Sequence, residues 1–331
     1  MPSADVRFPL PLTRLNPWYP GQIGVPGAWT ETGERMHCTG AVFYVDPNHT
    51  DANDNRDGTD ATSPLVTVAT ALTKCQPYRG DVIAIMANNA WGYNDASQGY
   101  GTPIQESVTV NIPGVRIVGV CPSGALGVPW TPATADGVCI TVNQPDVLIE
   151  GFCFMGNSGG MGVYAQYGNA VTSYGDNLIV RHCFFDSNMD EGIQLEYSWY
   201  VDIHDNVFDE CDEYGIYTAN VGGNDPAYAR IHHNWFHDCD TGAIWLTNAD
   251  RCHIYENTIY NVEAANDSAG TPANCMINLT SGSRNSVHHN MLACVLPAAV
   301  AWDYDACNTA GVGDAWCQNY LRDGVSVTNP T

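Results

Sequence analysis

A short motif that recurs along the middle and second half of the chain constrains its fold more than any other feature. Each copy has an aliphatic residue, two polar residues, a position that is usually Asn, a variable residue and a large apolar residue. The copies are IEGFCF, VRHCFF, IHDNVF, IHHNWF, IYENTI and VHHNML; they begin at Ile149, Val180, Ile203, Ile231, Ile254 and Val287, and are 31, 23, 28, 23 and 33 residues apart. A unit of this size cannot bury an apolar face alone, whereas stacked units share a continuous core.

A second motif follows the first. The segments GVYAQ, GIQLE, GIYTA and AIWLT align Val163, Ile193, Ile216 and Ile244, usually after a Gly. Both motifs alternate apolar and polar residues, which is the period of a strand with one buried face, and neither shows helical spacing. Each repeat therefore predicts two or three short strands that are joined by turns rich in Gly, Asn and Asp.

The aligned residues resemble the right-handed parallel β-helix of the pectate-lyase-like superfamily. The resemblance is carried by the Gly-Ile strands and by two columns of aligned residues, Asn206, Asn234, Asn257 and Asn290, and Phe154, Phe185, Phe208 and Phe236. It implies an all-β fold, a single-stranded right-handed parallel β-helix over residues 41–305, with a short N-terminal helix that caps the core. The Asn column is predicted to be a structural ladder of amides. Fold resemblance alone says little about activity.

The two ends of the chain differ from the repeats. Residues 1–40 are rich in proline and lack periodicity, so they predict an extended arm. The arm is too apolar for a linker and is predicted to lie along its own helix or a neighbouring subunit through Phe8, Leu10, Leu12, Trp18 and Tyr19. Residues 306–331 are predicted to form a C-terminal cap or tail that covers the open end of the sheets.

Charge and composition exclude several classes of partner. The chain has 12 basic and 36 acidic residues, a net charge of −24, and Lys74 as its single lysine. Such a surface repels phosphate backbones, so no nucleic-acid partner is expected. No apolar run is long enough to span a bilayer, and the N-terminus lacks the pattern of a secretion signal. We therefore expect synthesis in a cytoplasm without secretory export, and 13 cysteines that are mostly reduced and buried.

Four acidic residues are the candidates for catalysis. The repeats place Asp190 and Glu213 in one column, just before the Gly-Ile strands, and Asp212 and Asp240 in the adjacent column. Coils of a β-helix stack roughly 4.8 Å apart, so carboxyl groups one or two coils apart reach the separations found in glycosidases. Solvated turn residues are the competing interpretation. Outward histidines such as His204 and His232 are predicted to face solvent.

A second group of candidates lies on one predicted face. Alternation exposes Tyr164, Gln194, Tyr217 and Trp245, one on each of four consecutive coils. Aromatic rings spaced by whole coils, with amides between them, suit stacking against sugar rings, and they equally suit packing against another subunit. Glycan binding and a subunit interface both remain open for this stripe.

Known motifs and metal loops give little support for a specific reaction. Polygalacturonase-like hydrolases carry Asp-Asp and Gly-His-Gly, and this chain has neither; no arginine lies in a recognisable lyase motif. The loop DANDNRDGTD spaces Asn53, Asn55 and Asp57 like a calcium loop, but Pro64 stands where the essential Glu would be. We expect no required cofactor, with Ca²⁺ as an optional ligand.

These observations favour a structural protein on the surface of a virion, such as a phage capsid decoration protein, head spike or tailspike, which also binds glycans. Its partners would be itself, as a homotrimer, other virion proteins such as a capsid shell, and a surface polysaccharide. A carbohydrate-active enzyme (a polysaccharide lyase, glycoside hydrolase or epimerase) is the alternative, and a non-catalytic glycan-binding adhesin is the second alternative. An extracellular location is the alternative to the virion.

Overall fold

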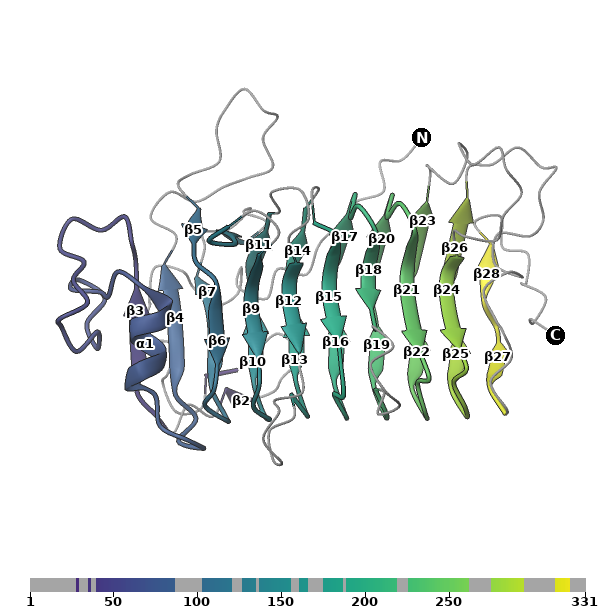
Figure 1. The fold of residues 1–331 in the computed structure, drawn as a ribbon, viewed down its shortest axis with the longest axis horizontal. Coiled ribbons are helices and arrows are strands. Elements are labelled where there is room, and N and C mark those ends of the chain that lie inside the picture. The colour runs from purple at the N-terminus through teal and green to yellow at the C-terminus, as the bar shows by residue number, and fades with distance from the viewer. Residues whose placement is uncertain are drawn as a thin grey trace, which may run out of the picture.

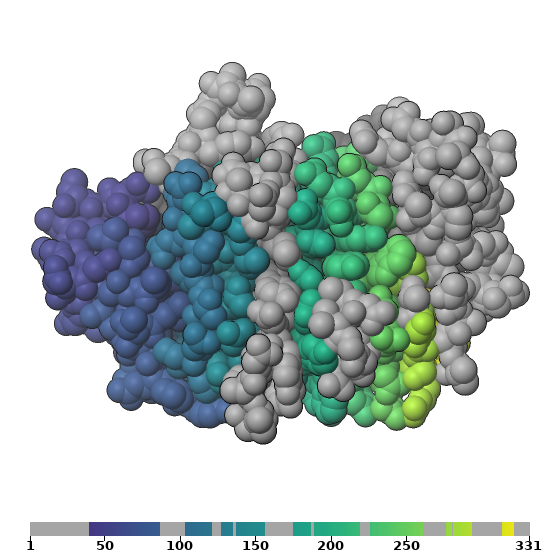
Figure 2. All heavy atoms as spheres, in the orientation of Figure 1, coloured from purple at the N-terminus to yellow at the C-terminus, as the bar shows by residue number. Residues whose placement is uncertain are grey.

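The chain folds into a right-handed parallel β-helix whose successive coils stack along the long axis of the molecule (Figure 1). The computed structural model describes residues 28–29, 35–36, 40–86, 103–120, 127–134, 137–155, 161–165, 175–186, 189–218, 226–261, 275–294 and 313–321. Figure 2 shows the coils as successive slabs, coloured in chain order from purple to yellow-green along that axis. The fold predicted from the repeats is therefore confirmed.

Within the described residues, each complete coil contributes one strand to each of three parallel sheets, here named sheets I, II and III in chain order. Sheet I contains β3 (Val42–Val45), β4 (Val82–Met86), β7 (Arg116–Val120), β10 (Leu148–Glu150), β13 (Ile179–Arg181), β16 (Asp202–His204), β19 (Arg230–His232), β22 (His253–Tyr255), β25 (Ser286–His288) and β27 (Ala315–Cys317). Sheet II contains β5 (Ile104–Gln105), β8 (Val128–Thr131), β11 (Phe152–Phe154), β14 (Phe184–Phe185), β17 (Val207–Asp209), β20 (Trp235–His237), β23 (Thr258–Asn261), β26 (Met291–Cys294) and β28 (Tyr320–Leu321). Sheet III contains β6 (Val108–Val110), β9 (Val138–Val142), β12 (Met161–Ala165), β15 (Glu191–Leu195), β18 (Tyr214–Tyr217), β21 (Gly242–Thr247) and β24 (Cys275–Thr280).

The N-terminal part adds one hairpin and one helix. The short strands β1 (Ala28–Trp29) and β2 (Arg35–Met36) pair antiparallel. Helix α1 (Val68–Lys74) begins after Thr67, whose side chain accepts a hydrogen bond from the Thr70 N–H, and it lies against β3, β4 and β6. The role of α1 as a cap remains a prediction. The arm residues Phe8, Leu10, Leu12, Trp18 and Tyr19 lie outside the described residues.

The core consists of columns of like residues that the parallel register brings together. In sheet I the aliphatic that opens each repeat pairs with its counterpart one coil away, as Ile203 does with Val180 and Ile231, and all three are fully buried. In sheet II the rings of Phe185, Phe208 and Phe236 stack with centroids 4.6 Å apart at each step. Burial of each such side chain contributes roughly 1.5–3 kcal/mol.

Glycines of sheet III make room for this aromatic stack. A Cβ atom on Gly192 would lie 2.6 Å from the ring of Phe208, and one on Gly215 would lie 2.6 Å from the ring of Phe236. No side chain fits at such a distance from a buried ring. Gly192 and Gly215, which precede the aliphatics of β15 and β18, are therefore required by the packing of the neighbouring phenylalanines.

A ladder of buried asparagines forms the turn between sheets I and II. The Asn234 amide donates from Nδ2 to the Ile203 carbonyl (2.9 Å) and to Asn257 Oδ1 (3.0 Å). Its own Oδ1 accepts from the backbone N–H and from Nδ2 of Asn206, at 3.1 and 3.0 Å. Asn290 and Asn319 continue the pattern. All hydrogen-bonding groups of each interior amide are used, which satisfies backbone groups that the turn would otherwise leave unpaired.

The helix extends one partial coil further along the chain than position 305, where the sequence analysis ends it. Strand β27 pairs with β25, and β28 pairs with β26, so Trp316 and Asn319 occupy the aliphatic and Asn positions of the motif. The motif search missed this copy because Trp316 stands where the other copies have an aliphatic residue. Within the described residues no helix is long and apolar enough to cross a membrane.

The Asn ladder gives a test of what stabilises the turn. Replacing Asn234 by Ala removes both donor contacts and both acceptor contacts at a site that is 2% exposed. We expect Asn234→Ala to lower the free energy of unfolding by about 2–5 kcal/mol, because several buried backbone and amide groups lose their partners. Urea denaturation followed by circular dichroism measures this change.

Asn143→Ala is the matched control, because Asn143 is only half-buried and its side chain reaches just one other amide, that of Asn111. It should change the free energy of unfolding by less than about 1 kcal/mol. Equal effects of the two substitutions would contradict a stabilising role for the ladder.

Candidate functional site

The outward face of sheet III collects the polar and aromatic residues that the sequence analysis placed in one stripe. Parallel pairing aligns Tyr164 with Gln194, Gln194 with Tyr217, and Tyr217 with Trp245. Strand β24 adds Asn278 next to Trp245. The side chain of Tyr164 lies outside the described residues. The stripe is therefore a column of the fold from β12 to β24. The prediction that Gln194 is exposed is wrong, since its side chain is buried, and Tyr217 and Trp245 are half-buried.

Acidic residues lie where the chain enters sheet III. The backbone N–H groups of Glu213 and Tyr214 donate to the Asp190 carbonyl at 2.9 and 3.0 Å, which places Glu213 one coil above Asp190. The N–H of Asp240 donates to the Cys211 carbonyl, so Asp240 lies one coil above Asp212. The predicted columns of acids are thus present in the backbone. Glu213, Asp212 and Asp240 are exposed, and Asp190 is half-buried.

A further acid, Glu191, was missed by the sequence analysis and is more deeply buried than the four predicted acids. Glu191 begins β15, pairs with Tyr214 of β18 and is 8% exposed. Burial, and then the neighbouring carboxyl groups of Glu213 and Asp190, raise the pKa of Glu191 to about 7. The alignment of the Gly-Ile motif began one residue later, at Gly192. The sequence did contain a signal for this residue, since Glu191 directly follows Asp190, one of the four predicted acids, and begins β15.

Aromatic rings flank this acid. Tyr214 and Tyr217 stack with ring centroids 4.8 Å apart, and Trp245 meets Tyr214 edge-on at 5.4 Å. All three side chains are half-buried. Burial, and then the carboxyl groups of Glu191, Glu213 and Glu196, raise the pKa of Tyr217. The rings and the carboxyl groups therefore belong to one cluster.

Two polar side chains, one on β15 and one just after its end, complete the cluster. Gln194 donates from Nε2 to Glu196 Oε1 at 3.0 Å, and both side chains are 8% exposed. Amides and carboxylates fixed in this way accept and donate hydrogen bonds in set directions, which is how proteins select among hydroxylated ligands. The cluster on sheet III, comprising Glu191, Gln194, Tyr214, Tyr217 and Trp245 beside Glu213, is the candidate site.

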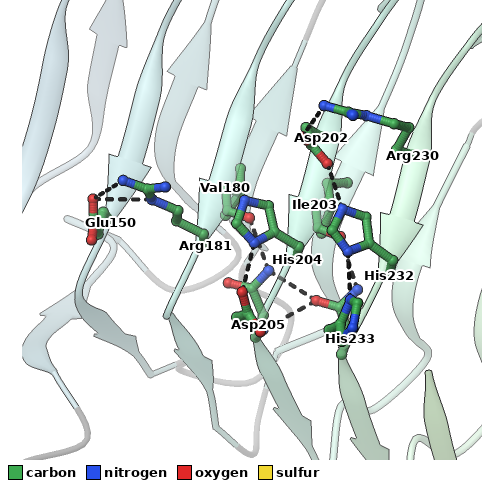
Figure 3. A network of polar contacts seen from close by, with 12 residues as sticks. Glu150, Val180, Arg181, Asp202, Ile203, His204, Asp205, Arg230, His232 and His233 are labelled. Carbon is green, nitrogen blue, oxygen red and sulfur yellow. Dashed lines mark hydrogen bonds and ion pairs between the residues drawn. The ribbon is translucent and has the colours of Figure 1, made fainter. Parts of the chain in front are cut away.

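A second polar cluster lies on the outward face of sheet I (Figure 3). Arg181 donates from Nε and Nη2 to Glu150 Oε2 at 3.2 and 3.1 Å. His204 Nδ1 lies 2.7 Å from Asp205 Oδ2, and the carboxylate of Asp202 contacts both His232 and Arg230. The charges of this cluster are matched with one another. It is therefore better explained as a structural network of paired charges than as a reactive centre.

Ring stacking along the same face covers the histidines to different extents, since His204 is buried and His232 and His288 are half-buried. His204 stacks on His232 at 5.0 Å, His232 on Tyr255 at 4.7 Å, and Tyr255 on His288 at 5.3 Å. His204 is 9% exposed, so the prediction that it faces solvent is wrong, because neighbouring rings cover it from the next coil. Burial and the nearby His289 lower the pKa of His288.

Two carboxylates on this face, those of Asp202 and Asp205, are held in their ionised form, whereas burial raises the pKa of Glu150 despite its contact with Arg181. Burial alone would raise the pKa of Asp202, but the hydrogen bond from His232 and the charges of His204 and Arg230 lower it below its ordinary value. Asp205 follows the same pattern, with His204 as its hydrogen-bond partner. This is the opposite of Glu191 on sheet III, whose neighbours are other acids.

The calcium-like loop folds around its own backbone. Asn53 Oδ1 accepts from the Asn55 N–H at 2.9 Å, and Asp57 Oδ1 accepts from the Thr59 N–H at 3.1 Å. These are turns in which a side chain caps a nearby backbone group. In the part of the chain that the structure describes, no group of three or more His, Cys, Asp or Glu side chains is arranged to hold a metal ion. A calcium ion at Asn53, Asn55 and Asp57 stays a prediction.

Comparisons with known proteins agree with this fold. A family model described as "Periplasmic copper-binding protein (NosD)" matches residues 127–291, and no curated protein sequence matches the chain. The chain is similar to a GH136 lacto-N-biosidase from Eubacterium ramulus, with 13% identity and a TM-score of 0.55 over 85% of this chain and 56% of that chain. It is also similar to ORF18 of Geobacillus virus E2 (12% identity, TM-score 0.46, 76% and 53% coverage) and to a rhamnogalacturonan lyase (12%, 0.40, 88% and 90%).

The likeness to the lacto-N-biosidase agrees with the parallel β-helix that the structure shows. At such low identity it shows the fold alone. The chain spans about half the length of the lacto-N-biosidase and of the viral protein.

The raised pKa of Glu191 predicts a pH-dependent stability. The folded state holds a proton on Glu191 up to about pH 7, whereas the unfolded chain loses it near the ordinary value of 4.5. The folded state therefore binds more protons between these values, and the free energy of unfolding falls as pH rises through this window. Glu191→Gln keeps the neutral form at every pH. We expect the variant to be more stable than the wild type at pH 8, by at most about 3 kcal/mol, and equally stable near pH 4.

Urea denaturation of the wild type and of Glu191→Gln at both pH values measures this difference. The variant at low pH is its own control for packing changes that the amide introduces. A stability difference that is the same at both pH values would show that Glu191 is not held in its neutral form.

Proposed function

We propose that the protein is a carbohydrate-active β-helix that binds a glycan along the outward face of sheet III and hydrolyses a glycosidic bond there. The observation that carries this proposal is the environment of Glu191, a buried carboxyl group placed between two other acids and beside a cluster of aromatic rings. Glycoside hydrolysis has three requirements that residues of this cluster can meet.

The first step is donation of a proton to the leaving group. Glycoside hydrolysis needs a carboxylic acid that is still protonated near neutral pH, because the oxygen of the glycosidic bond must take up a proton as the bond to the anomeric carbon breaks. Glu191 fits this role, since burial and its acidic neighbours raise its pKa to about 7. Its shift results from the two mechanisms that tune such acids, desolvation and like-charge proximity.

The second step needs another carboxyl group on the adjacent coil. Glu213 immediately precedes Tyr214, the residue that pairs with Glu191, and it is exposed to solvent. It can take the proton of the attacking water, or attack the anomeric carbon itself, while Glu191 protonates the departing oxygen. Asp190 directly precedes Glu191, and its charge favours the protonated form of that acid.

The third requirement is binding of the sugar, which precedes both chemical steps. Trp245 and Tyr217 occupy the same column on adjacent coils, and aromatic faces and edges pack against the apolar C–H surfaces of sugar rings. Gln194 and Glu196 lie one coil below and supply hydrogen bonds to hydroxyl groups. The site thus combines apolar contact and fixed polar groups, as small-molecule sites generally do.

The same face would also serve a protein that binds a glycan without cleaving it. This is the function of the virion-surface protein and of the adhesin that the sequence analysis considers. The geometry at Glu191 favours the enzyme over these two, since simple binding does not call for a protonated buried acid. Mass-spectrometric detection of the chain in purified virions tests the predicted location separately.

Incubation of the protein with a panel of bacterial and algal polysaccharides, followed by measurement of new reducing ends and of binding, tests the proposal. We expect turnover of at least one glycan, and a loss of about 100-fold or more in Glu191→Gln with binding retained. Trp245→Ala should instead weaken binding. Turnover should fall as pH rises above about 7, where Glu191 loses its proton.

Glu256→Gln is the matched control, because Glu256 is exposed and belongs to the network on sheet I. It should leave both turnover and binding unchanged. Binding that Trp245→Ala weakens, without any product, would establish a non-catalytic glycan-binding protein. Binding that is indifferent to every substitution on sheet III would exclude this face as the glycan site.

A further inference from the structure

The outward face of sheet II carries an apolar column that is buried at some coils and exposed at others. The column lies on the side of the sheet away from the phenylalanine stack, and it includes Cys153, Phe184, Val207, Trp235, Met291 and Tyr320. Cys153, Phe184 and Val207 are 4%, 6% and 8% exposed and form an apolar cluster separate from the core. Met291 and Tyr320, three and four coils beyond Val207, are 42% and 40% exposed. Since all of these side chains point outward, the early members of the column are covered and the late ones are not.

The turn between sheets I and II shows the same change in exposure. His182 and His233 occupy one left-handed position of this turn, with φ of 53° and 55°, two coils apart. His182 is 9% exposed, whereas the side chain of His233 is 51% exposed. Neighbours in the column do not account for this difference, because His182 lies next to Gly151, whereas His233 lies between Asp205 and Glu256. The cover over sheet II therefore extends across this turn.

Sheet I is covered at the same coils. Its outward residues Glu150 and Arg181 are 1% and 5% exposed, whereas Cys317, in the same column near the C-terminal end, is exposed. Oε1 of Glu150 is buried, and no group within the described residues donates a hydrogen bond to it. A buried oxygen normally has a donor, so a segment that lies over Glu150 is expected to supply one. We name the surface formed by Glu150, Arg181, His182, Cys153, Phe184 and Val207 the covered corner.

Internal segments outside the described residues match this surface poorly. Residues 156–160 and 187–188, which follow β11 and β14 beside the covered corner, consist of Gly, Asn and Ser, so they bring no apolar side chains to it. Residues 87–102 and 121–126 connect sheet I to sheet II one or two coils before β10. The chain that precedes β1 is a better match in position and in composition.

The position of the N-terminal hairpin brings the start of this chain to the covered corner. In Figure 1, strand β2 lies along the long axis level with β6 and β10, beyond β3 and β4. Residues 1–27 thus join the hairpin near the coils of the covered corner. Extended, they span up to roughly 90 Å, whereas the coils from β10 to β17 cover only roughly 10 Å. Length therefore does not limit the contact.

The composition of residues 1–27 suits this surface. Their prolines prevent them from extending a sheet, whereas proline-rich extended chains dock on surfaces lined by aromatic rings. Leu10 and Trp18 supply apolar side chains, and extended backbone supplies N–H donors. The segment carries Arg7 and Arg14 against Asp5, in a chain whose net charge is −24, so it is attracted to the acidic body.

We infer that residues 1–27 pack on the covered corner of their own chain and seal the outer faces of sheets I and II from β10 to β17. The hairpin tethers this segment near the surface, and a tethered segment has a high effective concentration. Tethering favours the arm of the same chain over that of a second copy. The inference does not depend on the proposed reaction at sheet III.

Thiol labelling of the full chain tests the inference, because its cysteines lie in three environments. Cys153 lies in the covered corner, Cys139 is fully buried in the core, and Cys317 is exposed. Iodoacetamide, followed by peptide mass spectrometry, should modify Cys317 quickly and the other two slowly. Leu10→Asp with Trp18→Asp places charges in the apolar contacts of the arm. We expect this variant to raise the labelling rate of Cys153 at least about tenfold and to leave Cys139 protected.

Thr13→Asp with Asn16→Asp is the matched control, because it adds the same two charges at polar positions of the arm. It should leave Cys153 protected, and protection should not depend on protein concentration. Cys153 that reacts as slowly in the Leu10 and Trp18 variant as in the wild type would overturn the inference. Protection lost on dilution would overturn it in favour of the arm of a second copy. Equal labelling of Cys139 would also overturn it, because the arm would then hold the core instead of covering one face.

Discussion

Parallel hydrogen bonding between successive coils is the constraint on which the rest of the structure depends. Because each coil repeats the path of the one before it, a residue and its counterparts form a column about 4.8 Å apart per step. Columns of Ile, Phe and Asn follow directly, since like side chains stack on like. The same geometry brings carboxyl groups on adjacent coils close together. A β-helix with acidic turns must therefore separate, pair or protonate these groups.

The two faces of the molecule meet this constraint in different ways. On sheet I, Asp202 and Asp205 are placed beside histidines and arginines, which lower the pKa of both carboxyl groups below the ordinary value. On sheet III, Glu191 has Glu213 and Asp190 as neighbours, and its pKa rises to about 7. A matched network stabilises the scaffold, whereas an unmatched buried acid reduces stability above neutral pH. Residues that lower stability in this way commonly persist because function requires them.

Features that repeat in every coil can be predicted from the sequence, whereas features found in single coils cannot. Motif alignment predicts the fold, the register of Ile203 with Ile231 and the Asn ladder, because every coil must satisfy the same packing. The alignment did not identify Glu191 as a site residue because no acid recurs at its position: its counterpart on the next coil is Tyr214. The burial of His204 could not be predicted from its own repeat because it depends on rings from neighbouring coils.

The central claim is that the outward face of sheet III holds a glycan with its scissile bond at Glu191. A crystal structure of the Glu191→Gln chain with a bound oligosaccharide measures this most directly, since the variant preserves the shape of the site and prevents turnover. We expect a sugar ring packed on Trp245 and a bridging oxygen within hydrogen-bond distance of the side chain at position 191. A sugar bound on sheet I, or anywhere remote from Glu191, would contradict it.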